Sequence, residues 1–413
     1  MGDSMSEGAY RAVPITNRVF WVGAIDWGLR DFHGYLTSRG STYNAYLITG
    51  EEPVLIDTVK APFREEMMAR IASVLDPSDI RCIVSNHAEM DHTGSLPEVI
   101  AEVRPDRVVA SKAGVKALRD HFHWDQEVQT VADGERLELG GTSLRFFEAR
   151  MLHWPDSMFT FFESEGVLFT NDAFGMHLAS AERFVDEIDP CTTRYEAAKY
   201  YANILLPFSP LVRKLLGRVP AWKLDLQMIA PDHGPVWRRD PGQILELYDK
   251  WAAQPYGRKA VVVYDTMWES TARMATAVGE GLAATGLHVV LMPLRSVHRS
   301  DVATEVLEAG ALVLGSPTMN GEVLPPLADV TTYLRGLKPQ RLVAAAFGSY
   351  GWSGEAVAKL AAVLEEMKLE AVANGVRVRY VPDAEALQAC RDLGTEVGRR
   401  LGDRLAASAN GGN

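Results

Sequence analysis

The sequence predicts two domains of different fold class: a mixed α+β sandwich in the N-terminal half and an α/β domain with a doubly wound, five-stranded parallel sheet in the C-terminal half. The chain of 413 residues is too long for a single small hydrophobic core and is long enough for two domains. A small, polar segment, AAQPYGRK at residues 252–259, separates two parts in which strands and helices follow different orders. We therefore expect one domain over residues 1–252 and a second over residues 259–413.

The N-terminal half contains short apolar segments with interspersed helices, in no regular alternation. This order is typical of a mixed sandwich rather than of a doubly wound sheet. The predicted strands are residues 18–22, 44–48, 53–56, 81–84, 143–147 and 167–170, and the predicted helices are residues 63–74, 195–206 and 243–251.

The C-terminal half alternates regularly between apolar strands and helical segments. Five such strands, each followed by a helix, predict a parallel sheet covered on both faces. Ligands of these sheets bind at the carboxyl ends of the strands. The predicted strands are residues 260–264, 288–292, 311–315, 342–347 and 377–381, and residues 406–413 are expected to be disordered.

Composition excludes several classes of partner. The net charge of -12 argues against nucleic acid and against an anionic membrane surface, because both require a basic face. No apolar stretch approaches the ~20 residues of a membrane span, and the first residues lack the pattern of a signal peptide. Three widely spaced cysteines give no disulfide framework. A reducing cytoplasm is the expected location.

A run of polar side chains, SNHAEMDH at residues 85–92, directly follows a predicted strand. It contains His87, Glu89, Asp91 and His92, which are four potential metal ligands within six residues. On a loop, His87 and Glu89 can converge on one ion while Asp91 and His92 turn toward a second. Burying so many charged groups without a cation would be costly. The run therefore predicts a metal centre.

Three further candidate ligands each follow an apolar strand or helix: His153 in MLHWPDSM, Asp172 in LFTNDAFG and His233 in IAPDHGP. A carboxylate such as Asp172 can bridge two cations. The seven side chains together suit two ions, and three carboxylates without cysteine favour non-haem iron over thiolate-bound zinc. His121 and His123 resemble a ligand pair, but they lie at the end of a predicted helix and are expected to be structural.

Three of the predicted parallel strands end in loops rich in hydroxyl groups, glycine and aromatic rings. Hydroxyls beside a helix N-terminus form a phosphate cradle, and aromatic rings can stack on a flat ligand. The loops lack both a Walker lysine and GxGxxG, which favours the single phosphate of FMN over a pyrophosphate. The expected FMN contacts are Thr266, Met267, Trp268, Ser270, Thr271, Pro317, Thr318, Met319, Asn320, Gly321, Ser349, Tyr350, Gly351 and Trp352.

The HAEMDH run with a later His, Asp and His resembles the metallo-β-lactamase superfamily, whose loop usually reads HxHxDH. Glu89 at the third position and the LHWPDSM segment are similar to the flavodiiron family (A-type flavoproteins), and the resemblance covers nearly the whole chain from VGAIDWGLRDFHGY onward. It implies an αββα metallo-β-lactamase-like sandwich followed by a flavodoxin-like sheet of strand order 2-1-3-4-5. It also implies that His87, Glu89 and His153 hold one iron, that Asp91, His92 and His233 hold the other, and that Asp172 bridges the two.

The same resemblance implies the activity and its helpers. The family reduces O2 to water, NO to N2O or both, with two iron ions per chain and electrons delivered through FMN. His33, His177 and Tyr201 match positions that line the diiron pocket, where each is a candidate proton or hydrogen-bond donor.

The resemblance also implies partners. No rubredoxin-like CxxC pair follows the second domain, so we expect a separate electron donor: rubredoxin, a similar carrier or a deazaflavin. A head-to-tail homodimer, or a dimer of such dimers, would bring each flavin to the iron pair of the other subunit. Two alternatives remain at this point: a dinuclear metal hydrolase of the metallo-β-lactamase superfamily with an appended flavodoxin domain, and an electron carrier whose metal site is only structural.

Overall fold

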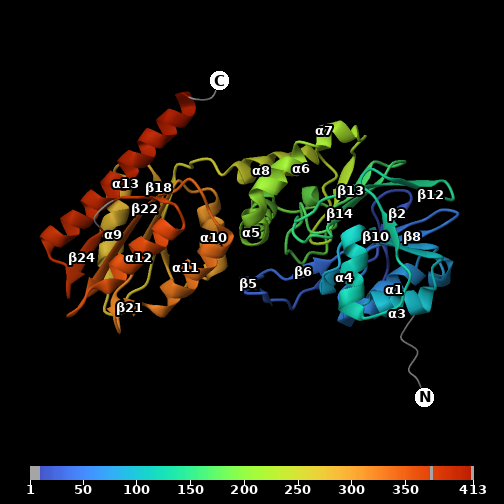
Figure 1. Cartoon of the computed structure of the whole chain (residues 1–413), viewed down its shortest axis with the longest axis horizontal. Helices are drawn as coiled ribbons and strands as arrows, with labels where there is room; N and C mark the ends of the chain where they lie inside the picture. The colour runs from blue at the N-terminus through green and yellow to red at the C-terminus, as the bar shows by residue number, and fades with distance from the viewer. Residues whose placement is uncertain (1–9, 373–374, 411–413) are drawn as a thin grey trace, which may run out of the picture. The chain divides into compact units, whose positions relative to one another are not determined.

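The computed structural model describes residues 10–372 and 375–410, and the chain divides into two compact units (Figure 1). The first unit contains the chain up to His33, Thr37–Tyr200 and Pro210–Asp249. The second contains Gly34–Leu36, Tyr201–Ser209 and the chain from Lys250 onward. Two short segments of the N-terminal half therefore group with the second unit. The domain limits of residues 1–252 and 259–413 stay a prediction.

The first unit is built on two sheets. The larger has the strand order β1-β2-β7-β8-β9-β10-β11 and the smaller has the order β12-β13-β14-β15-β16. The strands of the larger sheet are β1 (Val13–Pro14), β2 (Val19–Trp21), β7 (Tyr46–Ile48), β8 (Val54–Ile56), β9 (Cys82–Ser85), β10 (Arg107–Ser111) and β11 (Gln129–Val131). The strands of the smaller sheet are β12 (Arg136–Leu139), β13 (Thr142–Glu148), β14 (Met158–Phe162), β15 (Val167–Phe169) and β16 (Met228–Ala230).

Alternating side chains of the larger sheet enter two different cores. On β8, Val54 and Ile56 join the cluster shared with Phe146 and Phe162 of the smaller sheet, whereas Leu55 joins the cluster on the opposite face. That second cluster includes buried residues of α1 (Arg64–Ala72), α3 (Leu96–Val103) and α4 (Lys112–Phe122), which cover the outside of the sheet (Figure 1). The predicted sandwich of two sheets with covering helices is confirmed.

The second unit is a parallel sheet with the order β18-β17-β19-β22-β23, in which β24 also pairs with β22. This is the flavodoxin order 2-1-3-4-5 that the resemblance implied. Residues pointing to either face of β17, such as Val262 and Val263, are buried, because helices cover both sides. The strands are β17 (Lys259–Tyr264), β18 (His288–Pro293), β19 (Ala311–Gly315), β22 (Val343–Tyr350), β23 (Glu370–Ala371) and β24 (Val376–Arg379), and the helices are α9 (Ser270–Ala283), α10 (Arg299–Leu307), α11 (Pro325–Leu337), α12 (Glu355–Glu366) and α13 (Ala384–Asn410).

Two sequence expectations about helix ends need correction. The predicted helix at residues 195–206 is shifted along the chain: α5 (Pro190–Tyr200) begins five residues earlier and ends at Tyr200, and a π-helical turn, η4 (Tyr201–Leu205), follows. The expected disorder of residues 406–413 is wrong up to Asn410, where α13 ends, and residues 411–413 lie outside the described part.

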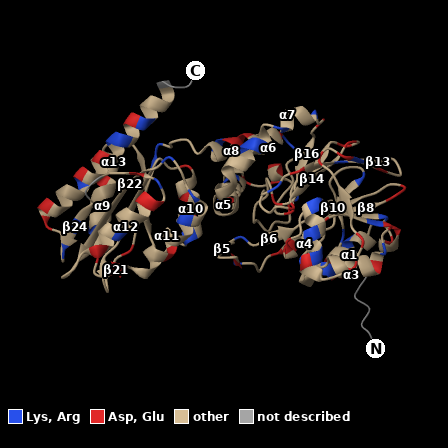
Figure 2. Cartoon of the chain, in the orientation of Figure 1, with Lys and Arg blue, Asp and Glu red and all other residues tan. Residues whose placement is uncertain are grey.

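Ion pairs of Glu396 with Arg399 and Arg400 lie along the charged face of α13 (Figure 2). No helix within the described ranges is long and apolar enough to span a membrane.

Candidate active site

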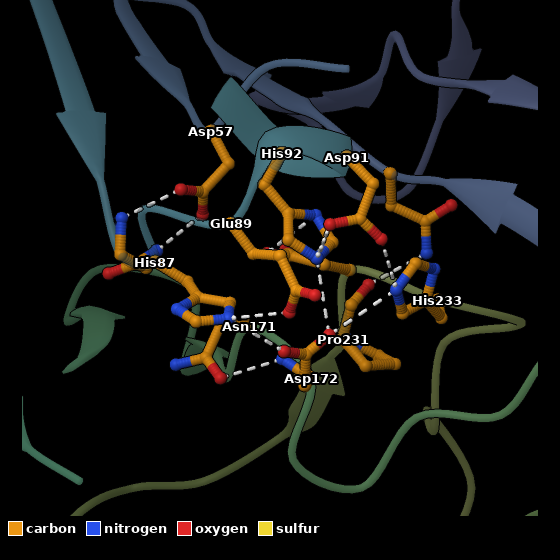
Figure 3. A network of polar contacts seen from close by, with 12 residues as sticks. Asp57, His87, Glu89, Asp91, His92, Asn171, Asp172, Pro231 and His233 are labelled. Atoms are coloured by element: carbon orange, nitrogen blue, oxygen red, sulfur yellow. Dashed lines mark hydrogen bonds and ion pairs between the residues drawn. The ribbon is translucent and has the colours of Figure 1, made fainter. Parts of the chain in front are cut away.

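The seven predicted ligands lie on loops and a short helix that follow strands of the two sheets in the first unit. His87 and Glu89 come after β9, while Asp91 and His92 lie in α2 (Met90–Thr93). His153 lies between β13 and β14, Asp172 follows β15, and His233 follows β16. Residues that are far apart in the sequence therefore lie close together, because the strands they follow are neighbours within the two sheets. Figure 3 shows most of their side chains pointing toward one another.

The loop that carries Asp172 is held by its neighbour. Asn171 adopts a left-handed backbone conformation, with φ of 45°, which asparagine tolerates better than most residues. Its side-chain amide donates to the carbonyl of Met158 at 2.8 Å, and its side-chain oxygen accepts from the amide of Asp172 at 2.7 Å. Asn171 therefore fixes the direction in which Asp172 leaves the sheet.

The ligands form two groups. His87, Glu89, His153 and Asp172 present one set of ligand atoms, and Asp91, His92 and His233 present another, with the atoms of each set within 4.8 Å of one another. In the first set, Glu89 Oε2 lies 3.3 Å from His87 Nε2 and 3.2 Å from His153 Nε2. In the second set, Asp91 Oδ2 lies 3.2 Å from His233 Nε2.

Asp172 connects the two groups through its two oxygens (Figure 3). Its Oδ2 lies 3.2 Å from His87 Nε2 and 3.1 Å from His153 Nε2. Its Oδ1 lies 3.2 Å from His92 Nε2 and 3.3 Å from His233 Nε2. One buried carboxylate thus faces a pair of imidazoles with each oxygen, which is the arrangement that a bridging ligand between two cations requires.

The charges of the two groups shift one another's pKa values. Burial alone lowers the pKa of His92, but Asp91 and Asp172 outweigh it and raise that pKa to about 9. Burial raises the pKa of Asp172, but the neighbouring imidazoles, His92 first, hold it well below its ordinary value. In the metal-free protein the histidines are therefore protonated partners of the carboxylates. A bound cation would replace those protons.

The opposite ring nitrogens of two ligand histidines have partners as well. His87 Nδ1 lies 3.2 Å from Asp156 Oδ2, which also accepts from the amide of Ala88 at 2.6 Å. His233 Nδ1 lies 2.6 Å from the carbonyl oxygen of Thr42. When a cation replaces the proton on Nε2, such contacts keep the hydrogen on Nδ1, so that the free lone pair of Nε2 faces the site.

The residues present fit two metal ions. Both side-chain oxygens of Asp91 and Oδ2 of Asp172 are buried and lie at ion-pair distance from imidazole nitrogens, yet they make no well-directed hydrogen bond to the described residues. Buried polar atoms of this kind are rare unless another ligand completes them. Four imidazoles and three carboxylates, with no thiolate, match the donors that non-haem iron accepts.

The second unit has a cavity of about 640 Å³ at the carboxyl ends of its strands. It is lined by eleven of the fourteen predicted FMN contacts, with rings from Trp352 and Tyr350 and hydroxyls from Ser270 and Ser349. The three other predicted contacts do not line it. Of these, Thr271 donates to or accepts from Ser349 Oγ at 2.9 Å, and Thr266 Oγ1 is buried with no hydrogen bond to any residue that the structure describes. Met319 lies in the short strand β20 (Thr318–Met319) beside the cavity.

Comparisons with known proteins match both units. A family model described as "ODP family beta lactamase" matches residues 42–234, and one described as "Flavodoxin" matches residues 262–394. A nitric oxide reductase of Moorella thermoacetica is 45% identical over 396 residues, which cover 95% of this chain and 99% of the relative.

Solved structures match over the same length. The rubredoxin oxygen:oxidoreductase of Desulfovibrio gigas superposes with a TM-score of 0.94 at 40% identity, covering 96% of this chain and 100% of that one. The flavodiiron protein of Giardia intestinalis superposes with a TM-score of 0.92 at 35% identity, covering 95% and 97%. This chain belongs to the flavodiiron protein family.

Membership in the flavodiiron family decides between the alternatives that the sequence left open. The relatives above are named as a reductase and an oxidoreductase, so they support a redox enzyme and not a dinuclear hydrolase or a carrier with a structural metal.

Two of the three predicted pocket residues of this flavodiiron protein, His33 and His177, lie beside the ligand groups. His33 Nε2 is 3.5 Å from Glu89 Oε1, and its side chain is 76% exposed. The buried ring of His177 lies 4.6 Å from that of His233, and its Nδ1 is 2.8 Å from Ser41 Oγ. Burial holds the pKa of His177 well below its ordinary value, so the ring is neutral.

The tyrosine beside the ligands is Tyr200, which the sequence reasoning missed. Its ring lies 5.1 Å from His177 and 6.1 Å from His233. The predicted residue, Tyr201, instead places its hydroxyl 3.0 Å from Ser209 Oγ and its ring 5.5 Å from Trp251. Successive residues of a helix point about 100° apart, so only one of two adjacent tyrosines can face the site. The LFTNDAFG and HAEMDH motifs carry no signal about which one.

The flavin cavity also includes three residues that the sequence reasoning missed: Ser353, Tyr380 and Val381. Tyr380 and Val381 directly follow β24, whose carboxyl end lies at the same edge as the predicted loops. The predicted strand ran through residue 381, so both residues were placed inside the strand and not in the loop at its carboxyl end, where ligands bind.

Proposed function

We propose that this flavodiiron protein is an oxidoreductase that reduces O2 to water, NO to N2O or both, at two irons held by the seven clustered side chains. The single observation that carries the proposal is Asp172, whose two oxygens each face a different pair of histidines at 3.1–3.3 Å. His87, Glu89 and His153 would hold one iron, and Asp91, His92 and His233 the other. FMN would bind in the cavity of the second unit.

The bound groups would supply the electrons: four for the reduction of one O2 to two waters, or two for the coupling of two NO to N2O and water. Both reactions also consume protons, and the chain's own residues can hold these. Burial and the charge of Asp172 raise the pKa of Tyr200 well above its ordinary value, so its hydroxyl keeps a proton beside that carboxylate. We propose Tyr200, with His177 and His33, as the groups that hold or move protons at the site.

The test is a reduction assay on full-length protein that is loaded with iron and FMN, chemically reduced under anaerobic conditions and then freed of excess reductant. Addition of O2 or NO should consume the gas and yield water or N2O without accumulating peroxide. An Asp172→Ala variant should lose this activity, while a surface control, Asp76→Ala, should retain it because the Asp76 carboxylate accepts bonds from Ser78 and belongs to neither ligand group. Hydrolytic turnover by zinc-loaded protein, with neither gas consumed by the iron form, would refute the proposal.

The electron donor is proposed to be a separate rubredoxin or a similar carrier, with a deazaflavin as the alternative. The support is the name of the Desulfovibrio gigas relative, a rubredoxin oxygen:oxidoreductase. Stopped-flow mixing with reduced rubredoxin and with a reduced deazaflavin would identify the donor by which one reduces the flavin rapidly. We also propose a cytoplasmic location, supported by three free cysteines, Cys82, Cys191 and Cys390.

We further propose a head-to-tail homodimer, or a dimer of such dimers, in which each flavin serves the iron pair of the other subunit. A two-fold arrangement makes both contacts at once. Support comes from the exposed rings of Trp268 and Trp352, which are 90% and 88% accessible at the flavin cavity of the isolated chain.

Subunit complementation tests this arrangement. A variant lacking iron ligands (His87→Ala with Asp172→Ala) is mixed with one lacking cavity residues (Ser270→Ala with Trp352→Ala). Exchange of subunits should restore part of the activity. An inactive mixture with proven exchange would mean that transfer occurs within one chain.

A further inference from the structure

Asp232 is a buried acid without an evident structural bond. It follows β16 and precedes His233, and it is 0% exposed. Neither of its side-chain oxygens accepts a hydrogen bond from the described residues. Its backbone, by contrast, is well held: its amide donates to Asn171 O at 2.8 Å, and its carbonyl accepts from Asn44 N at 2.7 Å. The position of Asp232 is therefore fixed by the main chain and not by its carboxyl group.

The carboxyl group of Asp232 faces one ring nitrogen. Its Oδ2 lies 3.5 Å from His92 Nδ1, and that nitrogen is itself buried without a hydrogen bond in the described chain. The other nitrogen of the same ring, Nε2, lies 3.4 Å from Asp91 Oδ1 and 3.2 Å from Asp172 Oδ1. His92 thus has one nitrogen toward the ligand group and the other toward Asp232.

Two other buried acids near the ligands, Asp57 and Asp156, accept hydrogen bonds from backbone amides and so help to hold the fold together. Asp57 accepts from the amide of Asn86 and from its side-chain Nδ2, both at 2.7 Å. Asp156 accepts from the amide of Ala88 in addition to facing His87. Burial of a carboxyl group without such bonds costs free energy. Burial of the Asp232 carboxyl group therefore costs free energy that no hydrogen bond from the described residues offsets, whereas the two bonds from Asn86 offset the burial of Asp57.

We propose that Asp232 is the positioning residue of His92: it accepts the Nδ1–H bond of the neutral imidazole, which leaves the lone pair of Nε2 toward the metal. This inference rests on the proposed iron site. It predicts that Asp232 contributes to metal retention and not to the stability of the metal-free fold, whereas Asp57 contributes to that stability.

The test uses full-length protein in three variants: Asp232→Ala, Asp232→Asn as the conservative change, and Asp57→Ala as the matched buried acid. Iron-loaded protein is challenged with a ferrous chelator and iron release is followed by absorbance. Loss of an outer partner of a metal-bound histidine typically weakens metal binding roughly 10- to 100-fold. We expect a weakening of that size for Asp232→Ala and a smaller one for Asp232→Asn, whose amide oxygen can still accept the bond.

The second readout is denaturant unfolding of the metal-free proteins. Asp232→Ala should leave the midpoint unchanged or raise it, and Asp57→Ala should lower it because Asn86 loses both bonds. If Asp232→Ala releases iron as slowly as the wild type, or lowers the metal-free midpoint as much as Asp57→Ala, Asp232 is not a positioning residue. Failure of the wild type itself to retain two irons would instead refute the proposed function, so the two failures are distinguishable.

Discussion

Adjacent tyrosines at the end of α5 provide a matched pair of residues. Tyr200 lies beside His177 and His233, whereas Tyr201 bonds Ser209. We expect Tyr200→Phe to lower gas reduction by about 10²-fold, the lower end of what a positioned proton donor contributes, with iron and FMN content unchanged. Tyr201→Phe should retain the activity. Equal rates for the two variants in a steady-state assay would remove Tyr200 from the proton path.

The protonated histidines make the stability of the metal-free protein depend on pH. The pKa of His92 is about 9 in the fold, against about 6.5 in the unfolded chain. A raised folded pKa stabilises the fold fully below pH ~6.5, and this contribution is lost as the pH rises through 9. Urea unfolding of the metal-free protein should therefore show lower stability at pH 9 than at pH 6.5, by roughly 3 kcal/mol from His92 alone. A flat profile would contradict the paired-histidine arrangement.

At the residue scale, sequence reasoning succeeded where several ligands are close together in the chain. His87, Glu89, Asp91 and His92 lie within six residues after one strand, so their convergence follows from local geometry. It failed for Tyr200, because the direction of a side chain on a helix depends on a rotation of about 100° per residue that no motif records. The roles of the ligands remain a proposal that metal analysis can test.

At the scale of elements, the strand ends explain the flavin cavity. Every residue that lines the cavity lies between Met267 and Val381, within the second unit. We expect a fragment of residues 250–413 to fold and to bind FMN, as measured by quenching of flavin fluorescence. A folded fragment that leaves FMN fluorescence unquenched would place the flavin elsewhere.

The same fragment should be less stable than the second unit in the full chain. It lacks Asn203, which donates to Ser300 O at 3.1 Å and accepts from Tyr333 at 2.7 Å, and it lacks Leu36, whose amide donates to Ser300 Oγ. Through these bonds the two segments hold the start of α10 and one side chain of α11. A melting temperature several degrees lower than that of the flavin unit in the intact protein is expected, and an equal one would show that the two segments contribute nothing.

The sequence predicted the strands of the second unit more accurately than it predicted the ends of one helix, α5, near the site. Regular alternation of strand and helix predicts a parallel sheet with right-handed crossovers, and the resemblance to flavodoxin supplied the strand order. The helix at residues 195–206 was predicted as continuous because its apolar pattern runs on past Tyr200. The π-helical turn η4 is a rare local structure that the apolar pattern does not predict.

For the whole molecule, metal and flavin should be separable. All seven clustered side chains belong to the first unit, and the residues that line the cavity belong to the second. Removal of iron by a chelator should therefore leave the FMN content unchanged, as measured by absorbance at the flavin band after desalting. Release of FMN in proportion to iron would show that the two sites depend on each other for binding.

The chain enters the second unit twice before its final passage, and each early entry comes directly after a side chain of the site: Gly34 follows His33, and Tyr201 follows Tyr200. Neither unit is consequently one uninterrupted stretch of gene. A chimera that joins the first 252 residues of one relative to the flavodoxin part of another would graft Gly34–Leu36 and Tyr201–Ser209 onto a foreign α10. Successful recombination between relatives should therefore retain or co-transfer these two short stretches, and their sequences should change together with α10 as the lineage diverges.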